Sequence, residues 1–338
     1  MKNKIALPKL AKYAAFGVLL LAAYLILPSA GTTSKYMMKI INEGLIYFIA
    51  VLGLSVVLGL GGQVTFSTAG IMGIGAYVSA ILTTRYGWGT LPALLVAVIA
   101  CVIFSYFAGL ALFRLKGSYF AFASIALVNL IFTILQNWMD MTGGPDGISK
   151  IPNLGIGSLE CKNYYSYFRL IAIVAVICGL LVQRIRKTYF GRALSSVRDN
   201  EIAARCMGIN PYRTKVYSFV VAGAFAGLAG SLYAFQAGYI TPDPFKFDQS
   251  AIYLIMVMLG GVDSTVGAFI GTLLLTILPE KLRILQDYYQ LVYGVGVIIL
   301  MVVMPMGIVG LAKSVRKRFR ARRKKKQALM EKQAEEVV

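Results

Sequence analysis

Histidine is absent from the 338 residues of this sequence, and acidic side chains are scarce, with 14 Asp and Glu against 34 Lys and Arg. The absence of imidazole removes the commonest general base and the commonest metal ligand. The four cysteines are far apart and form no C-x-x-C pair, so no structural disulfide is expected. The sequence therefore predicts no catalytic residue, no metal site and no cofactor.

A nucleotide-binding motif is also missing. A phosphate-binding loop for ATP ends in Gly-Lys-Ser or Gly-Lys-Thr, and neither tripeptide occurs in the sequence. The apolar stretches hold almost no ionisable residue, and four such residues lie at or near their ends: Glu43, Arg169, Asp263 and Glu280. A carrier driven by protons or sodium would be expected to keep carboxylates near the middle of the membrane. If the protein moves a solute uphill, its energy must come through a partner.

Charged residues make up only 14% of the chain and hydrophobic residues 58%, with a mean hydropathy of +0.72. A soluble domain of this length would carry far more surface charge, so the composition predicts an integral membrane protein. A membrane-spanning helix needs about 20 mainly apolar residues. Such stretches recur up to about residue 310 and leave no room for a separate soluble domain. The expected fold is therefore all-α.

The hydrophobic pattern predicts about ten transmembrane helices. They cover residues 11–27, 40–60, 68–83, 91–113, 119–138, 167–183, 216–238, 250–259, 265–278 and 291–310. The first could instead be a cleaved signal peptide, but its apolar run is long for that role, so an uncleaved helix is favoured. The two short segments 250–259 and 265–278 are separated by a break at Gly260-Gly261.

Basic residues gather in three places, at 2–12, at 184–215 and at 313–326, with ten of the 34 in the last cluster. Basic clusters beside apolar spans mark the cytoplasmic side of a membrane protein. Both termini and the central cluster are therefore expected in the cytoplasm, with six spans before the central cluster and four after it. In this topology Cys206 faces the cytoplasm and Cys161 faces outward.

Two regions follow from this pattern. A spanning domain covers 1–311 and includes a polar loop at 184–215, and a basic cytoplasmic tail covers 312–338. The tail begins directly after a span, so attraction to anionic membrane lipids is favoured over binding to nucleic acid.

Two stretches of the chain look alike. "LGGQVTFSTAGIMGIGAYVSAIL" and "LGGVDSTVGAFIGTLLLTIL" share Leu-Gly-Gly, then Ser-Thr, then spaced glycines. Glycine pairs interrupt helices and permit close backbone contact. They favour either paired broken helices along a substrate path or tight packing of small residues between helices, and both alternatives remain open. The candidate pathway or hinge residues are Gly61, Gly62, Ser67, Thr68, Gly260 and Gly261.

A charged block, "DNEIAARCMGIN" at 199–210, interrupts the apolar pattern near the middle of the chain. Asp199 or Asn200 can cap a short helix, and Gly208 can end it in a left-handed conformation. Glu201 and Arg205 are spaced for an i,i+4 ion pair. The opposite face of this helix carries Ile202, Ala203, Cys206 and Met207. A helix of two turns does not persist alone in water, so it needs a groove on a partner or rests on the membrane surface.

The sequence "EIAARCMGIN" resembles the Glu-Ala-Ala…Gly motif of permease subunits of ATP-binding-cassette importers. Four other stretches, "LKGSYFAFASIAL…TGGPDGISKIP", "FGRALSSVRDNEIAARCMGINPYRTK", "FAGLAGSLYAFQAGYITPDPF" and "MVMLGGVDSTVGAFIGTLLLTILPE", are similar to one subfamily. It is the permease of branched-chain amino acid importers, the subunit with the longer N-terminal part. The resemblance runs from about Glu43 to Leu311. The basic tail lies outside it.

The resemblance implies a permease subunit, not an enzyme, in a bacterial cytoplasmic (inner) membrane. Its implied partners are two ATPase subunits, a second homologous permease and an extracytoplasmic binding protein. The implied ATPase-coupling residues are Glu201, Ala203, Ala204, Arg205 and Gly208. The implied cargo is leucine, isoleucine, valine or a related amino acid or amide. Urea, short amides or sugars are alternative cargoes, and a passive channel or a membrane-embedded enzyme is less favoured.

Overall fold

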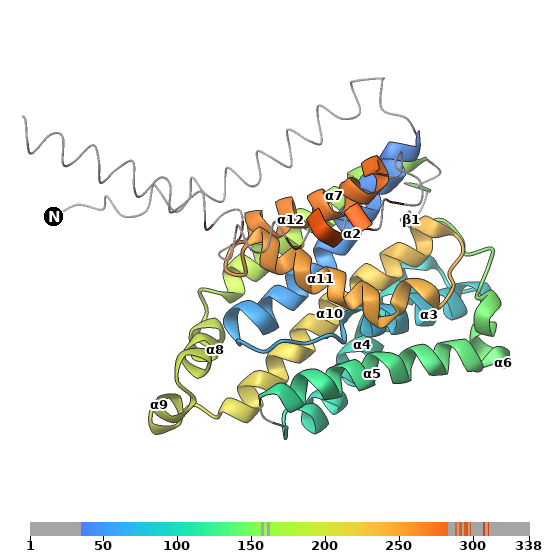
Figure 1. Cartoon of the computed structure of the whole chain (residues 1–338). Helices are drawn as coiled ribbons and strands as arrows, with labels where there is room; N and C mark the ends of the chain where they lie inside the picture. Colours follow the sequence, from blue (N-terminus) through green and yellow to red (C-terminus); the bar gives the residue numbers. More distant parts are fainter. Residues whose placement is uncertain are drawn as a thin grey trace, which may run out of the picture.

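The computed structural model describes residues 35–115, 117–156, 159–160 and 163–282, together with isolated positions between 288 and 310 (Figure 1). The expected first helix at 11–27, Cys161, the tail at 312–338 and most of the last expected span lie outside these residues. Within the described part the expected all-helical fold is confirmed, with one pair of two-residue strands. The helices are α2 (Lys35–Ser55), α3 (Thr68–Thr84), α4 (Thr90–Leu112), α5 (Ser118–Asn137), α6 (Met139–Thr142), α7 (Tyr164–Ile185), α8 (Tyr189–Asp199), α9 (Glu201–Cys206), α10 (Pro211–Ala237), α11 (Phe247–Gly260) and α12 (Thr265–Leu282).

The short elements lie between these helices. A π-helical turn, η1 (Val56–Leu60), continues α2, and two 3-10 turns are η2 (Gly144–Asp146) and η3 (Asp243–Phe245). The strands β1 (Gly155–Ile156) and β2 (Leu159–Glu160) pair antiparallel. Most helix bounds agree with the sequence expectation to within a few residues. One expectation was wrong: α12 does not end before Pro279 but continues through it to Leu282.

Six helices of the described part are long and apolar enough to cross a membrane. They are α4, α5, α7, α10, α12 and the continuous α2–η1 helix, Lys35–Leu60. The apolar helices α3 and α11 have 17 and 14 residues, which gives them lengths of about 25 and 21 Å at 1.5 Å per residue. A hydrocarbon core is about 30 Å thick, so neither helix crosses it squarely. The expected total of ten spans remains a prediction.

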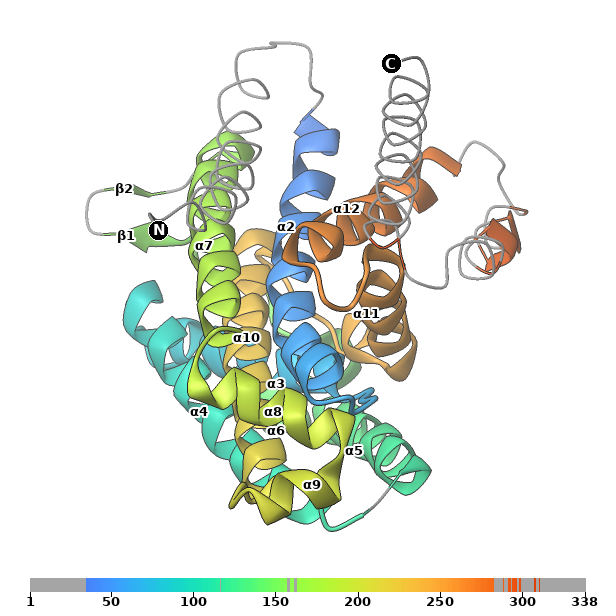
Figure 2. The same ribbon diagram turned by 90° about the vertical axis from the view of Figure 1, so that its left-hand side faces the viewer.

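The two most buried long helices, α2 and α10, form the centre of the bundle. Within their most apolar segments, 83% and 72% of the residues are buried, against 28% for α4 and α5. Helix α10 packs on α3, α4 and α2, and α2 also packs on α7 and α12 (Figures 1 and 2). The outer helices expose large apolar side chains, among them Leu95, Ile99 and Ile103 of α4. An apolar outer surface of this kind suits a helix that faces lipid.

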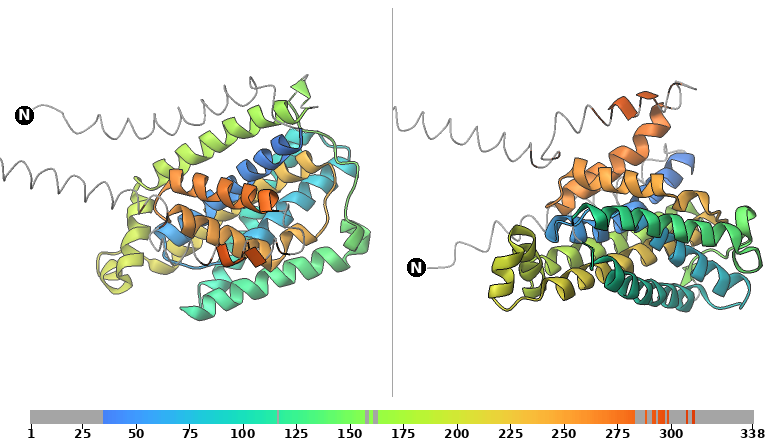
Figure 3. Two further views of the ribbon diagram at one scale, coloured as in Figure 1. Left: turned by 45° about the horizontal axis from the view of Figure 1, so that its top comes forward. Right: turned by 60° about the horizontal axis from the view of Figure 1, so that its bottom comes forward.

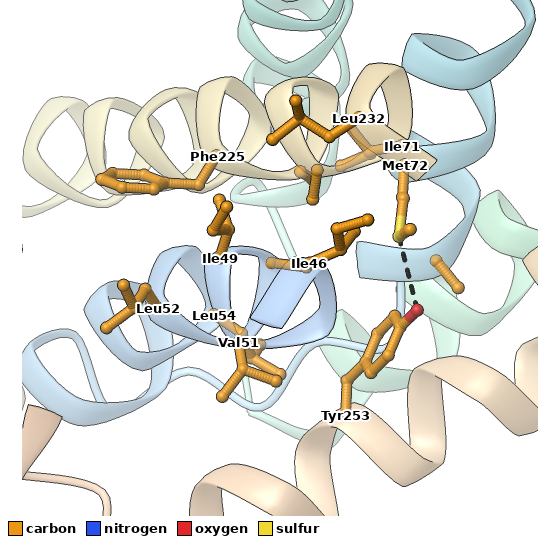
Figure 4. Packing of buried hydrophobic residues seen from close by; sticks show 14 of the residues in the cluster. Ile46, Ile49, Val51, Leu52, Leu54, Ile71, Met72, Phe225, Leu232 and Tyr253 are labelled. Carbon is orange, nitrogen blue, oxygen red and sulfur yellow. Dashed lines mark hydrogen bonds between the residues drawn. The ribbon is translucent and has the colours of Figure 1, made fainter. Parts of the chain in front are cut away.

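The centre is filled by aliphatic and aromatic side chains from helices far apart in the sequence (Figure 4). Ile46 and Ile49 of α2 lie in one cluster with Phe225 and Leu232 of α10. The hydroxyl of Tyr253 on α11 donates to Met72 Sδ of α3 at 3.3 Å, so the phenol is not left unpaired in an apolar core.

The short helices α3 and α11 meet at their N-terminal ends. The Ala69 N–H donates to Ser250 Oγ at 3.0 Å, so a hydroxyl of α11 satisfies one of the free donors in the first turn of α3. The segment before α3 is not helical, and its Phe66 N–H donates to Ser124 Oγ of α5 at 3.0 Å. Side chains of two other helices thus stabilise the beginning of α3.

The loop with the sequence "TGGPDGI" contains the 3-10 turn η2, and its last residue, Ile148, forms a bridge with Ile240. It lies beside α6, at the end of the bundle opposite α8 and α9 (Figures 1 and 3). The end that carries α8 and α9 is named the α9 end below.

Glycines let α3 approach α10 closely enough for backbone contact. A Cβ atom built on Gly75 of α3 would lie 2.6 Å from the Gly227 carbonyl oxygen of α10. Small residues at such helix contacts allow the close packing that stabilises helix pairs in membranes. The spaced glycines of the first glycine-rich stretch therefore include at least one that serves tight packing, one of the two alternatives.

We predict that Gly75→Ala lowers the free energy of unfolding by about 1–3 kcal/mol, because backbone atoms cannot move aside as a flexible side chain can. The matched control is Gly109→Ala in the neighbouring helix α4, where the nearest atoms to an added Cβ lie at 3.5 Å. That substitution should be neutral or slightly stabilising. Unfolding of the purified protein in detergent measures both variants, and equal stability of the two would contradict this account.

Candidate functional site

The polar block of the sequence folds into two short helices at one end of the bundle. Helix α8 follows α7, helix α9 follows α8 after the single residue Asn200, and α10 then returns through the bundle (Figure 2). Helix α8 is amphipathic and buries Ala193, Leu194 and Val197. Helix α9 has only six residues and buries Ala204 alone. The block is therefore anchored through α8, while α9 lies at the surface.

Both ends of α9 have the expected capping residues. Of the two candidates, Asn200 is the cap: its Oδ1 accepts from the N–H groups of Ile202 and Ala203, each at 3.0 Å. Asp199 instead accepts from Arg198 Nε at 3.2 Å. At the other end Gly208 has φ +79°, the left-handed conformation that the sequence predicted. Nothing lies within 4 Å of a Cβ built there, so backbone conformation alone favours glycine.

Glu201 holds α9 in place through two ion pairs. The expected i,i+4 pair with Arg205 is confirmed at 3.0 Å, and a second pair joins Glu201 to Lys215 of α10 at 2.8 Å. The hydrogen bond from Lys215 is the largest cause that lowers the pKa of the Glu201 carboxyl below its ordinary value. The Lys215 pair was missed by sequence reasoning because no helical spacing relates residues on two different helices.

The apolar face expected on α9 points away from the rest of the chain. Ile202 is 76% exposed and Met207 is 82% exposed, and Ala203 and Cys206 are exposed beside them. Ala204, on the side of α9 facing the bundle, is 3% exposed. This exposed apolar face fits both alternatives from the sequence, a groove on a partner or the membrane surface.

The two glycine breaks lie against each other at the α9 end. The first follows the π-helical turn η1, whose C-terminal residue is Leu60, and contains Gly61 and Gly62, the latter with φ +66°. The second ends α11 at Gly260, with Gly261 at φ +103°. A Cβ built on Gly59 would lie 2.7 Å from the Val262 carbonyl oxygen. The sequence predicted both breaks, and the structure shows that they touch.

Arg198, in the last turn of α8, contacts both breaks. Its guanidinium donates to the Gly59 carbonyl oxygen and lies 3.4 Å from Asp263 Oδ1. A Cβ built on Gly62 would lie 2.6 Å from Arg198 Cγ. Sequence reasoning missed Arg198, because its partners Gly59 and Asp263 are 139 and 65 residues away in the chain.

Ser67 and Thr68 do not belong to this cluster. They are buried where α3 begins, next to Ser250 of α11, and Ser67 Oγ lies 3.0 Å from Thr65 Oγ1. The six candidate pathway residues therefore fall into two places. Gly61, Gly62, Gly260 and Gly261 lie at the α9 end, and the two hydroxyl residues lie at the junction of the short helices.

A cavity of about 950 Å³ opens beside the first break at the α9 end. Its lining comes from the segment after η1, the connection between α4 and α5, and the facing side chains of α9 and α10. The lining includes Gly62, Gln63, Val64, Arg114, Ser118, Glu201, Arg205, Tyr212 and Lys215. Three cations face one carboxylate, so the net charge of the lining is positive, and the wall also includes the apolar side chains of Phe113, Leu115, Ala121 and Phe122. Among the described residues, no group of three or more His, Cys, Asp or Glu side chains is placed to hold a metal ion.

Comparison with known proteins gives a consistent result. Residues 36–304 match the family described as "Branched-chain amino acid transport system / permease component". The chain is 32% identical over 315 residues to the high-affinity branched-chain amino acid transport system permease protein LivM of Escherichia coli K12, covering 86% of this chain and 74% of that protein. No solved structure gives a significant match.

Two further relatives are more distant. The permease protein LivH of the high-affinity branched-chain amino acid transport system of Escherichia coli K12 is 26% identical, with 80% of this chain and 93% of LivH covered. BraD of Pseudomonas aeruginosa, described as a permease protein of a high-affinity branched-chain amino acid transport system, is 26% identical, with 81% of this chain and 96% of BraD covered. The similarity therefore extends over nearly the whole described bundle.

We predict that Gly62→Ala destabilises the protein by about 1–2 kcal/mol more than Gly87→Ala. Both glycines have φ +66°, so both variants bear the same backbone cost. Nothing lies within 4 Å of a Cβ at Gly87, whereas Gly62 faces Arg198. Unfolding in detergent measures the difference. In an Arg198→Ala background the excess cost should disappear, and its persistence would show that Arg198 is not the obstacle.

Proposed function

The chain belongs to the permease family of branched-chain amino acid transport systems, and from that premise we propose that α9 is the helix through which an ATPase subunit drives this permease. The transported solutes are leucine, isoleucine and valine, or a closely related small amino acid. They pass from an extracytoplasmic binding protein into the cytoplasm. The coupling residues are Glu201, Ala203, Ala204, Arg205 and Gly208.

The exposed apolar face of α9 is the observation that carries this proposal. A helix of six residues does not form in water without support, yet α9 is fixed by the Asn200 cap and by the Glu201–Lys215 ion pair. These contacts hold Ile202 and Met207 outward. Burial of two such side chains in a groove contributes about 1.5–3 kcal/mol each.

The energy source is assigned to a partner because the chain offers none of its own. The sequence has no phosphate-binding loop, and Glu43, in the third turn of α2, is paired with Lys39 at 3.8 Å. An ion-coupled carrier would need a carboxylate deep in the membrane. Two ATPase subunits, a second homologous permease and the binding protein complete the proposed complex. Lipids surround the exposed faces of α4, α5 and α7.

The proposed topology has ten spans in a bacterial inner membrane, with α9 and both termini in the cytoplasm. It rests on the clusters of Lys and Arg beside the apolar segments. The decisive experiment is reconstitution of the co-purified complex in vesicles. Uptake of labelled leucine should require ATP and the loaded binding protein together. Uptake without either component would support a passive channel instead.

We predict that Ile202→Glu and Met207→Glu each weaken binding of the ATPase subunits at least tenfold, because each removes apolar burial and places a charge in the groove. Ser196→Glu is the matched control, since it adds the same charge to an exposed position of the adjoining helix α8. Co-purification and titration with the ATPase subunit measure the effect. Unchanged binding in both α9 variants would show that α9 is a surface loop without a docking role.

We predict that Cys206 reacts with a membrane-impermeant thiol reagent only from the cytoplasmic side. The side chain is exposed, while Cys101 and Cys178 are buried, so labelling at Cys206 is separable from labelling at those two. Variants that retain Cys206 or Cys161 alone are compared in intact cells and in inverted vesicles. Cys161 should react in intact cells, and Cys206 in inverted vesicles. Labelling of Cys206 in intact cells would overturn the ten-span topology.

A further inference from the structure

We propose that Arg198 and Arg186 are positioning residues for transport, which make both glycine breaks move together with α8 and α9. This inference rests on the proposed role of α9 and extends it from the docking surface to the interior of the permease. The cluster of Arg198, Arg186 and the two breaks is named the arginine clasp below.

Arg198 joins α8 to both breaks with one side chain. Its guanidinium donates to the Gly59 carbonyl in η1, directly before the first break, and pairs with the Asp263 carboxylate of the second break at 3.4 Å. Its aliphatic carbons pack over Gly62, where a Cβ would lie 2.6 Å from Arg198 Cγ. Glycine at position 62 is thus what allows the arginine stem to lie on the first break.

Arg186, directly after α7, provides the second half of the clasp. Its Nη2 donates to the Val262 carbonyl at 3.3 Å and to Ser55 Oγ at 3.4 Å, and its Nη1 donates to the Asp263 carbonyl. Val262 and Asp263 belong to the second break, and Ser55 is the last residue of α2 before the π-helical turn. One guanidinium therefore ties the end of α7 to the second break and to the end of α2, directly before the π-helical turn that leads to the first break.

The chemistry requires arginine. A guanidinium presents five N–H donors in a planar fork, so it can serve carbonyl groups on two segments at once. Lysine supplies a single compact charge on a flexible stem and cannot keep the same spacing. The two carbonyls at Gly59 and Val262 lie where helices are interrupted, and such groups need partners from outside their own helix.

The connection to α9 is short and stiff. Arg198 is separated from Glu201, the first residue of α9, by Asp199 and the cap Asn200. Helix α8 is held to the bundle by buried Leu194, whose Cδ1 would lie 3.3 Å from a Cβ on Gly61. A displacement of α9 by a partner is therefore expected to move α8, and with it the first break.

Joint movement of the first break and α9 displaces two walls of the cavity at the α9 end relative to the wall formed by the α4–α5 connection and α5. Gly62, Gln63 and Val64 form one wall of that cavity, and Glu201 and Arg205 of α9 form another. The second break joins α11 to α12, so it can pass the same movement to two helices that contact α2. The clasp thus couples the docking helix to a cavity wall and to a helix junction together.

In the reconstituted complex, the test separates binding of the ATPase subunits to α9 from transmission of its movement to the two breaks. Arg198→Gln removes the charge and the fork, and Arg186→Gln removes the second half of the clasp. Arg192→Gln is the matched control, because Arg192 is an exposed arginine of the same helix α8 that donates to the Lys187 carbonyl at 2.7 Å. ATPase binding, stimulated ATP hydrolysis and leucine uptake are measured for each variant.

Both clasp variants should bind the ATPase subunits within twofold of the natural protein, yet transport at least tenfold fewer leucine molecules per ATP hydrolysed. Arg198→Lys should give an intermediate ratio, and Arg192→Gln a normal one. A normal number of leucine molecules transported per ATP hydrolysed in both Arg198→Gln and Arg186→Gln would overturn the proposal for the clasp. Failure of the α9 docking proposal would instead appear as unchanged ATPase binding in Ile202→Glu, a separate measurement. If Arg198→Gln does not fold, Asp263→Asn removes the ion pair alone and should lower the same ratio.

A distance measurement excludes a merely structural role. Spin labels are attached to the exposed Cys206 of α9 and to a cysteine introduced by Val64→Cys, with the other cysteines replaced by serine. When Arg198 is present, this distance should stay constant between ATP-bound and nucleotide-free complexes, because α9 and the segment after the first break move as one. In Arg198→Gln it should change between the two states. A distance that changes equally with and without Arg198 would overturn the proposal.

Discussion

A backbone that leaves its helix inside a membrane protein must find hydrogen-bond partners within the protein, because hydrocarbon offers none. This constraint shapes the bundle more than any other interaction. Where α3 begins after a non-helical segment, Ser124 and Ser250 supply hydroxyl acceptors to the N–H groups of Phe66 and Ala69. Where η1 and α11 end, Arg198 and Arg186 supply donors instead, to the carbonyl groups of Gly59 and Val262. Each interruption is therefore held by a different helix.

Because other helices supply the hydrogen-bond partners of the interrupted backbone, each interruption is mechanically linked to those helices. A break that is stabilised by its own helix could bend independently, but here the partners come from α5, α7, α8 and α11. The central helices α2 and α10 are packed through glycine contacts and buried aliphatic side chains, which resist deformation. We therefore expect movement where polar contacts replace packing. Among these places, the end of η1 and the second break are connected through Arg198 to the segment that carries α9.

The surface of the molecule also has two kinds of region. The outer faces of α4, α5 and α7 are apolar over several turns, whereas the α9 end combines charges with exposed apolar side chains that include Ile202 and Met207. The first kind of surface is stable in lipid. The second suits the docking role proposed for α9, because docking helices typically insert a few apolar anchors into a groove on the partner. The family of the chain and this division of its surface agree.

The sequence by itself determined the features that depend on neighbouring residues. Hydrophobic length located the apolar helices of the described part to within five residues at either end, although it did not predict α6 or α8. Local capping chemistry located both ends of α9, with Asn200 at its start and Gly208 in the left-handed conformation after it. The Glu201–Arg205 pair followed from helical spacing. These interactions act within one or two turns, so the order of residues is enough to specify them.

Only the tertiary structure decided which distant segments meet. It brought the two glycine breaks together, moved Ser67 and Thr68 away from them, and placed Lys215 and Arg198 as the partners that link separate elements. Contacts of this kind depend on how helices pack, and a single sequence carries no spacing rule for them. A polar residue in such a chain is therefore recognisable from the sequence, but its partner is chosen by the fold, because the unsatisfied backbone groups that attract it appear only once the helices are packed.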